Sequence, residues 1–324
     1  MVCPNAVTPV ALDTRTSEAP IRLPIQGTPP LGSFAITTSP DGRIAFVVTR
    51  DAPPDGAGRD VVVPIDLASQ RADRPIALPG HGGTHAVVVM HDGKTVLAAS
   101  GTTIVPVSVS SGAVGTPLDL GSGKTVFGMA LSPTSSMLYV LVPGGVVPVN
   151  TTTATAGPLI PTGLTVSSVS SPHGLVVSAD GATVYVSGQG GADFGGRLVP
   201  ITAATGAVGA ASSFDQFGIA DPTAIALTAD GARILAADGA NNWIVPVPVV
   251  PPGVPSAPVP LPTGHEAGAV GTNHPSDIVV GPGATGAFVV TGLDTVLPFA
   301  PNGGAFGQSI RVCSGASSMT VAGA

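Results

Sequence analysis

The sequence is poor in charge, because only 10 per cent of its 324 residues are charged. It has two lysines, Lys94 and Lys124, and two glutamates, Glu18 and Glu266. Lys and Glu are good helix formers, so their scarcity argues against a helical fold. The abundance of Val and Thr, with 44 Gly and 34 Pro, favours strands and turns instead. The net charge of −7, without basic clusters, argues against nucleic-acid and acidic membrane partners.

Long unbroken hydrophobic runs are also lacking. The longest uncharged candidate, residues 243–262, contains many prolines and could not keep helical hydrogen bonding in lipid. We therefore expect no transmembrane segment, and no signal peptide is visible. The sequence contains no nucleophile elbow, phosphate loop, HExxH or CxxC pattern, so no familiar catalytic motif is present.

One hairpin unit recurs along the chain. Its clearest copy, residues 173–202, has an apolar run, a turn at Asp180-Gly181, a second run, a Gly-rich loop and a third run. An Asp-Gly pair between alternating apolar runs predicts a hairpin with a tight primed turn. Related copies start near residues 34, 85, 127, 223, 275 and 318. Their spacing of about 40 to 53 residues is that of four-stranded propeller blades.

A proline between apolar residues marks the third run of every unit. It occurs seven times, at Pro9, Pro64, Pro106, Pro148, Pro200, Pro246 and Pro298. Proline cannot donate to a sheet ladder, so each strand must hold it at a bulge or at a site without a hydrogen bond. Seven prolines in register predict seven equivalent backbone sites.

We therefore predict an all-β, seven-bladed β-propeller with four-stranded antiparallel blades in one domain. Residues 1–27 would supply the third and fourth strands of a composite blade and residues 316–324 its first strand, with the second strand missing. Closure of this kind removes exposed sheet edges. The other blades would span approximately residues 28–80, 81–122, 123–165, 166–217, 218–268 and 269–315.

The two cysteines lie where ring closure would need a covalent link. Cys3 precedes the third strand of the composite blade, and Cys313 ends the blade before it. A disulfide between them would stabilise the fold by about 4–5 kcal/mol in the chain-entropy model and would favour an extracytoplasmic location. The alternative is two buried or free thiols.

The repeats resemble the YVTN family of seven-bladed propellers. The resemblance rests on SPDGRIAFVVT, SADGATVYVSG and TADGARILAADG, together with the third-strand prolines, and it covers nearly the whole chain. The turns of two blades depart from it, with Thr134-Ser135 and Pro282-Gly283 in place of Asp-Gly. The resemblance implies the fold and a bacterial, secreted or surface location. It does not choose a function, because similar propellers include sensor domains, lactonases, lyases and copper proteins.

Loop lengths predict which face of the ring binds a ligand. Turns between first and second strands are short, whereas several second-to-third and blade-to-blade loops are long, and variable loops on a rigid scaffold usually carry binding. We expect ligand contacts from these loops and from the starts of the innermost strands. The candidate ligand-binding residues are Phe34, His85, Phe127, His173, Asp193, Phe194, Phe214 and Asp221.

Histidines give a second, enzymatic hypothesis. His85, His173 and His274 would face the central channel and could ligate a divalent metal, although they could equally cap strand ends in a wet channel. His265, Glu266 and His274 form the densest ionisable group and are candidate acids and bases, or simply polar loop residues.

The leading hypothesis is a monomeric, extracytoplasmic binding or sensing scaffold. It would recognise a protein or small-molecule partner on the long-loop face and need no cofactor. The alternative is a lyase- or lactonase-like enzyme with histidines at the channel, which would need a divalent metal if they are ligands.

Overall fold

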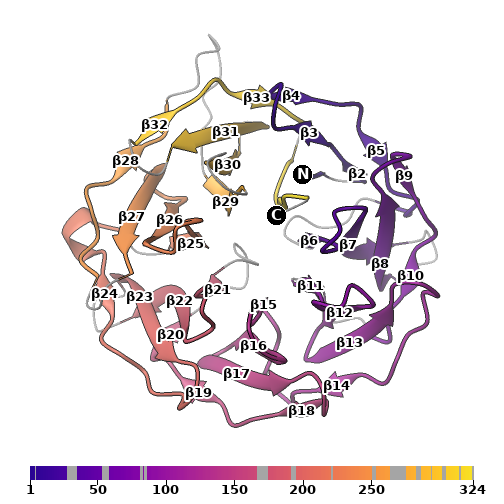
Figure 1. The fold of residues 1–324 in the computed structure, drawn as a ribbon, viewed down its shortest axis with the longest axis horizontal. Coiled ribbons are helices and arrows are strands. Elements are labelled where there is room, and N and C mark those ends of the chain that lie inside the picture. The colour runs from indigo at the N-terminus through magenta and orange to yellow at the C-terminus, as the bar shows by residue number, and fades with distance from the viewer. Residues whose placement is uncertain are drawn as a thin grey trace.

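The computed structural model shows a ring of β-sheets around a central axis (Figure 1). The described residues are 1–3, 5–27, 35–52, 58–80, 83, 86–165, 174–190, 195–219, 222–249, 253–262, 275–281, 286–292, 294–300, 304–313 and 315–322. Strands dominate this part of the chain, and its one helix is the three-residue 3-10 turn η1 (Asp215–Phe217). No helix in these ranges has the length and apolar character to cross a membrane.

Six sheets follow one another in chain order and are named blades 1 to 6. Blade 1 holds β6 (Ala35–Thr38), β7 (Ile44–Asp51), β8 (Arg59–Asp66), β9 (Arg71–Ala72) and β10 (Ile76–Ala77); blade 2 holds β11 (Val87–Val89), β12 (Thr95–Ser100), β13 (Thr103–Ser108) and β14 (Leu118–Asp119). Blade 3 holds β15 (Gly128–Leu131), β16 (Met137–Val142), β17 (Gly145–Asn150), β18 (Thr155–Ala156) and β19 (Ile160–Pro161).

The second half of the ring repeats this arrangement. Blade 4 holds β20 (Leu164–Thr165), β21 (Leu175–Val177), β22 (Thr183–Gly190), β23 (Gly195–Thr202) and β24 (Ser212–Ser213); blade 5 holds β25 (Pro222–Leu227), β26 (Arg233–Asp238), β27 (Trp243–Pro248) and β28 (Val259–Pro260). Blade 6 holds β29 (Pro275–Val280), β30 (Ala287–Thr291), β31 (Thr295–Ala300), β32 (Ala305–Phe306) and β33 (Ile310–Arg311).

The seventh sheet, the closing blade, joins both ends of the chain. It contains β1 (Val2–Cys3), β2 (Ala6–Val7) and β5 (Ile21–Arg22), and the short hairpin of β3 (Val10–Ala11) and β4 (Thr16–Ser17) extends it. The Val2 N–H donates to the Ser318 carbonyl at 2.8 Å, and the Ser317 N–H donates to the Val2 carbonyl at 3.1 Å. The predicted all-β, seven-bladed propeller is confirmed.

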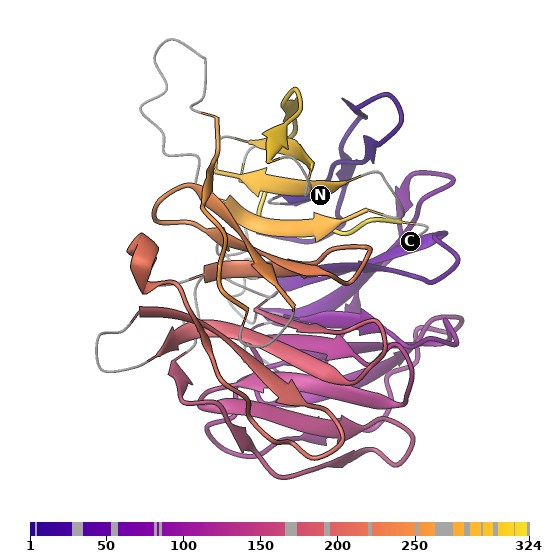
Figure 2. The same cartoon turned by 60° about the vertical axis from the view of Figure 1, so that its left-hand side comes forward.

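The closing blade differs from expectation in its second strand. We predicted that this strand is missing, but β1 lies between Ser318 and β2 and occupies the part of its place opposite Ala6 and Val7. Two residues without a preceding turn motif carry no recognisable strand pattern, so β1 could not be predicted from the sequence. Figures 1 and 2 show the N-terminal strands beside the yellow C-terminal segment.

Each third-strand proline is bonded in the same way. The carbonyls of Pro106, Pro148 and Pro200 accept hydrogen bonds from glycine N–H groups at 2.7–2.8 Å, and those of the other four accept one from Glu18, Asp73, Ser256 or Gly307. All these donors belong to the outer segments of their blades, so the side of the proline that lacks an N–H also faces outward. The six prolines of blades 1 to 6 therefore pair with the second strand in unbroken register, as the site without a hydrogen bond that we expected.

The Asp-Gly turns are wider than predicted. In blade 4 the Ser178 N–H donates to the Thr183 carbonyl, which leaves four residues in the loop, and the Gly181 N–H donates back to Ser178. Only Gly181 has a positive φ, 72°, whereas a primed type I′ turn needs two such residues. The prediction of a tight primed turn is wrong. The aspartate is needed because Asp180 Oδ1 accepts bonds from the Ser178 hydroxyl and the Ala182 N–H.

The core lies between the blades. Seven clusters of buried residues occur in the described chain, and each joins two neighbouring blades, including blade 6 with the closing blade and the closing blade with blade 1. In one of these clusters Val140 and Val147 of blade 3 pack with Leu97 of blade 2. Since burial of apolar surface drives folding, each blade is stabilised by both neighbours, and the ring gains from being closed.

A disulfide joins Cys3 of the closing blade to Cys313 of blade 6, with their Cα atoms 6.0 Å apart. The Thr8 hydroxyl donates to Cys313 Sγ at 2.9 Å. The predicted pairing is present in the structure.

Candidate functional site

Hydrogen bonds identify which loops share a face of the ring. The Ala52 N–H, just after β7, donates to the Gln26 carbonyl in the segment that leads into blade 1, and the Gly196 N–H donates to the Ile219 carbonyl in the segment that leaves blade 4. Ends of second-to-third hairpins and blade-to-blade segments are therefore neighbours. We call this side the long-hairpin face. On the opposite side, the Leu67 N–H donates to the Arg43 carbonyl, which joins a third-to-fourth turn to an Asp-Gly turn.

Two hairpins reach further toward the long-hairpin face than the others. The strands of β7–β8 and β22–β23 have eight residues each, whereas the equivalent strands of the other described hairpins have five or six. The extra pairs are Arg50↔Asp60 and Asp51↔Arg59 in blade 1, and Gln189↔Gly196 and Gly190↔Gly195 in blade 4. Figure 1 places these two blades well apart around the ring.

The end of the blade 1 hairpin carries four charged residues, Arg50, Asp51, Arg59 and Asp60. Asp51 Oδ1 accepts a bond from the Gln26 N–H at 2.7 Å, which fixes the incoming segment against the hairpin. Arg59 is exposed, and the Arg50 side chain lies against Gly58, where a Cβ would approach Nε to 2.7 Å. A larger residue at this position would displace the Arg50 guanidinium, which is the end of a flexible side chain and can move.

Asp60, at the base of this hairpin, is fully buried. The Ser100 hydroxyl of blade 2 donates to Asp60 Oδ2 at 2.6 Å, while Oδ1 has no hydrogen-bond partner among the described residues. An unsatisfied buried oxygen is costly and is found at sites with a special role. Asp60 was not among the residues predicted from the sequence. The sequence signal for its burial was its position directly before the apolar run VVVPI. A strand of this kind packs between neighbouring blades, where side chains have little access to water.

The blade 4 hairpin holds an ion pair. Arg197 donates to Asp215 Oδ1 at 2.5 Å and to the Gly196 carbonyl at 3.0 Å, and its side chain is only 15% exposed. Asp215 belongs to η1, so the pair fixes the segment that leaves blade 4 over the start of β23. Sequence reasoning placed a long loop here but did not single out these two residues.

Two of the predicted ligand-binding residues lie in the described chain, and both are in the core. Phe127 is 9% exposed and packs with Leu141 and Leu175 between blades 3 and 4. Phe214 is fully buried in the cluster between blades 4 and 5. Both side chains pack in the core between blades. Ligand binding by either of them stays a prediction. The remaining candidates, Phe34, His85, His173, Asp193, Phe194, Asp221, His265, Glu266 and His274, lie outside the described residues.

The three predicted metal ligands, His85, His173 and His274, all lie outside the described residues. Within the described ranges no group of three His, Cys, Asp or Glu side chains is arranged to hold an ion. His91, on the opposite face, has Nε2 2.7 Å from the Ser132 carbonyl, a contact between the turns of blades 2 and 3.

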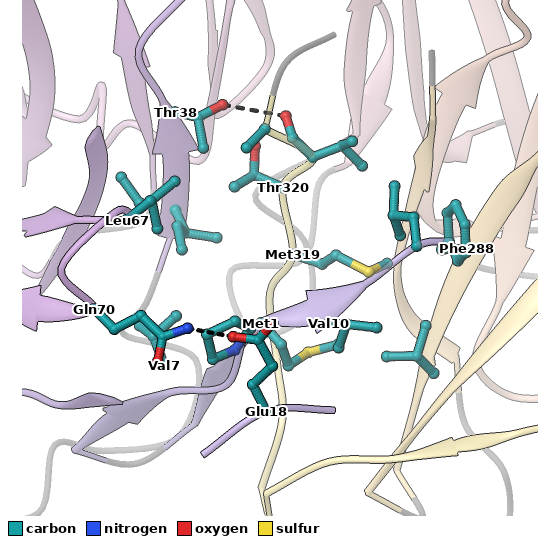
Figure 3. A pocket seen from close by; sticks show the side chains of 17 residues that line it. Met1, Val7, Val10, Glu18, Thr38, Leu67, Gln70, Phe288, Met319 and Thr320 are labelled. Atoms are coloured by element: carbon teal, nitrogen blue, oxygen red, sulfur yellow. Dashed lines mark hydrogen bonds between the residues drawn. The ribbon is translucent and has the colours of Figure 1, made fainter. Parts of the chain in front are cut away.

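A cavity of about 310 Å³ lies in the closing blade (Figure 3). Three adjacent blades form its walls. They contribute Val10 and Met1 from the closing blade, Thr38 and Leu67 from blade 1, and Phe288 from blade 6. The lining is mostly apolar, and Glu18, bonded to the Gln70 amide, is the charged residue among those that line it. No binding site was predicted here from the sequence.

Comparisons with known proteins bear on the fold. No family model matches the sequence, and no curated protein matches it. Among solved structures, Kuenenia stuttgartiensis hydrazine synthase aligns with a TM-score of 0.70 at 16% identity, over 89% of each chain. The RRP9 WD40 repeats align with a TM-score of 0.72 at 13% identity, over 98% of this chain and 89% of theirs. The Cps50 (Swd1) β-propeller domain of Myceliophteria thermophila aligns with a TM-score of 0.64 at 15% identity, over 86% of each chain.

These likenesses show the fold alone. Their names cover an enzyme, a WD40 repeat protein and a propeller domain, so the shared ring fits different functions.

Proposed function

We propose that this chain is a YVTN-type, extracytoplasmic binding propeller that recognises a protein or small-molecule partner on its long-hairpin face. The observation that carries the proposal is the extension of β7–β8 and β22–β23 beyond the other hairpins on that face. Six- and five-residue strands suffice to build a blade here, so the extra pairs are not needed for the ring. The disulfide between Cys3 and Cys313 supports an oxidising compartment.

The physical basis is a rigid platform with projecting polar groups. Seven interblade cores hold the sheets, and the two long hairpins present Arg59, Gln189 and the Arg197–Asp215 pair above them. Because the backbone beneath is fixed, little conformational entropy is lost when a partner binds, which favours affinity. Arginine at such a surface also gives geometrically specific contacts with carboxylates.

The test compares two double variants that remove the same charge from opposite faces. Arg50→Ala/Arg59→Ala alters the long-hairpin face, and Arg43→Ala/Lys94→Ala alters the Asp-Gly turns. Each immobilised variant is used to capture proteins and metabolites from the extracytoplasmic fraction of the source cells, with quantification by mass spectrometry. We expect the first variant to lose partners that the wild type and the second variant retain. Equal capture by both variants would refute binding at this face.

A further inference from the structure

One place in the outer wall of the ring breaks the sevenfold pattern. In each blade, a residue of the outer segment pairs with the residue two places before the third-strand proline. In six blades this residue is aliphatic, and the register gives Ile21, Ile76, Leu118, Ile160, Val259 and Ile310. In blade 4 the same register gives Ser212, which pairs with Leu198. Ser212 is 8% exposed, so a hydroxyl group stands in a buried place where the other blades have a branched hydrocarbon.

The aliphatic residues close the joint between neighbouring blades. A Cβ on Gly112, in the third-to-fourth turn of blade 2, would lie 3.2 Å from Ile76 Cδ1 of blade 1. A Cβ on Gly206 of blade 4 would likewise lie 3.2 Å from Ile160 Cδ1 of blade 3. Each of these side chains therefore packs against the turn of the next blade. The Ser212 side chain is too short to make the same contact with blade 5.

Two cavities lie at this joint, between the neighbouring outer strands β24 and β28 (Figure 1). The larger, named the outer cleft, has a volume of about 250 Å³ and is lined by Ser212, Ser213 and Gln216 of blade 4 and by Gly253, Val254 and Pro255 of blade 5. The smaller has about 10 Å³, no more than one water molecule needs, and reaches the buried Tyr185. Ser212 lines both, so the serine lies where the two cavities meet.

The wall from blade 5 also departs from the repeat. The N–H that donates to the third-strand proline carbonyl belongs to Ser256, ten residues after Pro246, whereas in the other blades the donor lies nine residues after the proline, as Gly157 does after Pro148. Val254 lies in this longer segment and is 67% exposed, the most exposed large hydrophobic side chain of the described chain. An apolar side chain thus stands at the mouth of the outer cleft.

Polar groups lie deeper in the outer cleft. The Ser212 hydroxyl has no hydrogen-bond partner in the part of the chain that the structure describes. A buried hydroxyl without a partner is costly, and this one lines the cavity and can bond with a ligand there. The Gln216 amide crosses the cleft, where Nε2 donates to the Pro255 carbonyl at 3.4 Å. Among the residues that line either cavity, none is charged.

We propose that the outer cleft binds a branched aliphatic side chain from a polypeptide segment of a partner protein. This side chain takes the place of the aliphatic residue that blade 4 lacks. The neighbouring peptide groups of the segment bond with the Ser212 hydroxyl and the Gln216 amide. The cleft lies between the outermost strands of two blades, so it is a different site from the hairpin ends of the long-hairpin face.

The size and the uncharged lining of the cleft favour a polypeptide side chain over other ligands. Its volume of about 250 Å³ is below the range of about 300–1,000 Å³ of pockets that enclose drug-sized molecules. A free amino acid would place its ammonium and carboxylate groups among uncharged residues, and burying unpaired charges is costly. A residue within a polypeptide carries neutral amides instead, which a hydroxyl and a side-chain amide can satisfy.

The direct test is a titration with N-acetyl-isoleucine amide, followed by NMR through the backbone amides of Ser212, Gln216 and Val254. We expect saturable chemical-shift changes with a dissociation constant in the millimolar range, because the probe is small. N-acetyl-alanine amide lacks three of the side-chain carbons and should bind at least about tenfold more weakly. Equal binding of the two amides, no binding of either, or equally tight binding of free isoleucine would overturn the proposal.

Variants locate the bound side chain. Ser212→Ile restores the residue of the other blades, so it should fill the cleft, raise the unfolding temperature and abolish binding of the isoleucine amide. Ile160→Ser is the reverse change in blade 3, and it should lower the unfolding temperature while the cleft of blade 4 still binds the probe. Retained binding in folded Ser212→Ile would overturn the assignment.

Val254→Asp tests the site without a change in the core, because this residue is exposed. A carboxylate at the mouth of the cleft should weaken binding of the isoleucine amide at least about fivefold and leave the unfolding temperature unchanged. Unaltered binding in this variant would contradict the proposed site. So would a dimer, measured by light scattering without the probe, that Ser212→Ile dissociates, because a second copy of the chain would then be the occupant.

Discussion

At the scale of single residues, repetition extends to contacts between proline rings and glycines. A Cβ on Gly157 would lie 3.1 Å from Pro148 Cγ, and Gly115 and Gly209 have the same relation to Pro106 and Pro200. Each glycine also donates its N–H to the proline carbonyl. In these three blades a side chain on the outer segment would meet the proline ring, whereas Glu18, Asp73 and Ser256 make the same bond in three other blades.

This contact predicts an interaction between two substitutions. Gly157→Val should destabilise the protein by about 1–3 kcal/mol, because the side chain meets the Pro148 ring. Combined with Pro148→Ala, the same change should cost less than the sum of the two single changes. Urea unfolding of the four proteins measures the coupling. If the two losses in free energy of unfolding are strictly additive, the contact with the proline ring is not the reason for the glycine at this position.

The turn aspartates predict a response to acid. The Ser178 hydroxyl, followed by the Ala182 N–H, holds the pKa of Asp180 below its usual value, and the pKa values of Asp41 and Asp230 are lowered in the same way. A carboxylate with a lowered folded pKa adds stability that is fully present above its unfolded pKa of about 3.9. That stability is lost as the pH falls through the folded pKa.

We therefore expect thermal stability to decrease below about pH 4 and Ser178→Ala to raise the pKa of Asp180 toward its ordinary value. Carboxyl chemical shifts followed by NMR during an acid titration measure this pKa directly. An unchanged Asp180 titration in the variant would mean that the hydroxyl does not stabilise the carboxylate.

At the scale of strands, Asp277 of β29 marks the joint with the closing blade. The register gives Gly128 of blade 3 and Ala224 of blade 5 as its counterparts, so a carboxylate here is exceptional. Asp277 is fully buried, and its Oδ2 accepts a bond from the Met319 N–H at 2.7 Å. This bond ties the C-terminal segment to blade 6.

Asp277→Ala should fit sterically, since small residues occupy the matching places, but it leaves the Met319 N–H buried without that acceptor. We expect a loss of about 1–3 kcal/mol in the free energy of unfolding. Ala224→Ser, at the matching place of blade 5, is the control for a mild change in volume. Proteolysis near residues 317–322 should quicken in Asp277→Ala alone, and unaltered cleavage there would contradict a joining role.

The sequence was informative where a pattern repeats and uninformative where it occurs once. Proline spacing predicted the blade number, and the cysteine positions predicted the disulfide. The strand at Val2 and the burial of Asp60 depend on contacts between segments distant in the chain, which no local pattern encodes. The turn type was misjudged because a four-residue loop with one left-handed glycine contains the same Asp-Gly pair as a primed turn.

At the scale of the whole molecule, the ring is closed both by hydrogen bonds and by one covalent link. The disulfide spans 310 residues, so Cys313→Ser should lower the free energy of unfolding by about 4–5 kcal/mol in the chain-entropy model. Cys3→Ser should cost a similar amount, and the double variant should cost little more, because either change breaks the same bond. Fully additive losses in chemical denaturation would indicate that the two cysteines act separately.

Amide hydrogen exchange measured residue by residue by NMR tests the closing blade most directly. We predict that the Val2 and Ser317 amides exchange as slowly as those of β16 and β17, because they donate across the joint between the two ends of the chain. Rapid exchange at Val2 and Ser317, at the rate of an unstructured chain, would contradict a ring closed by both termini.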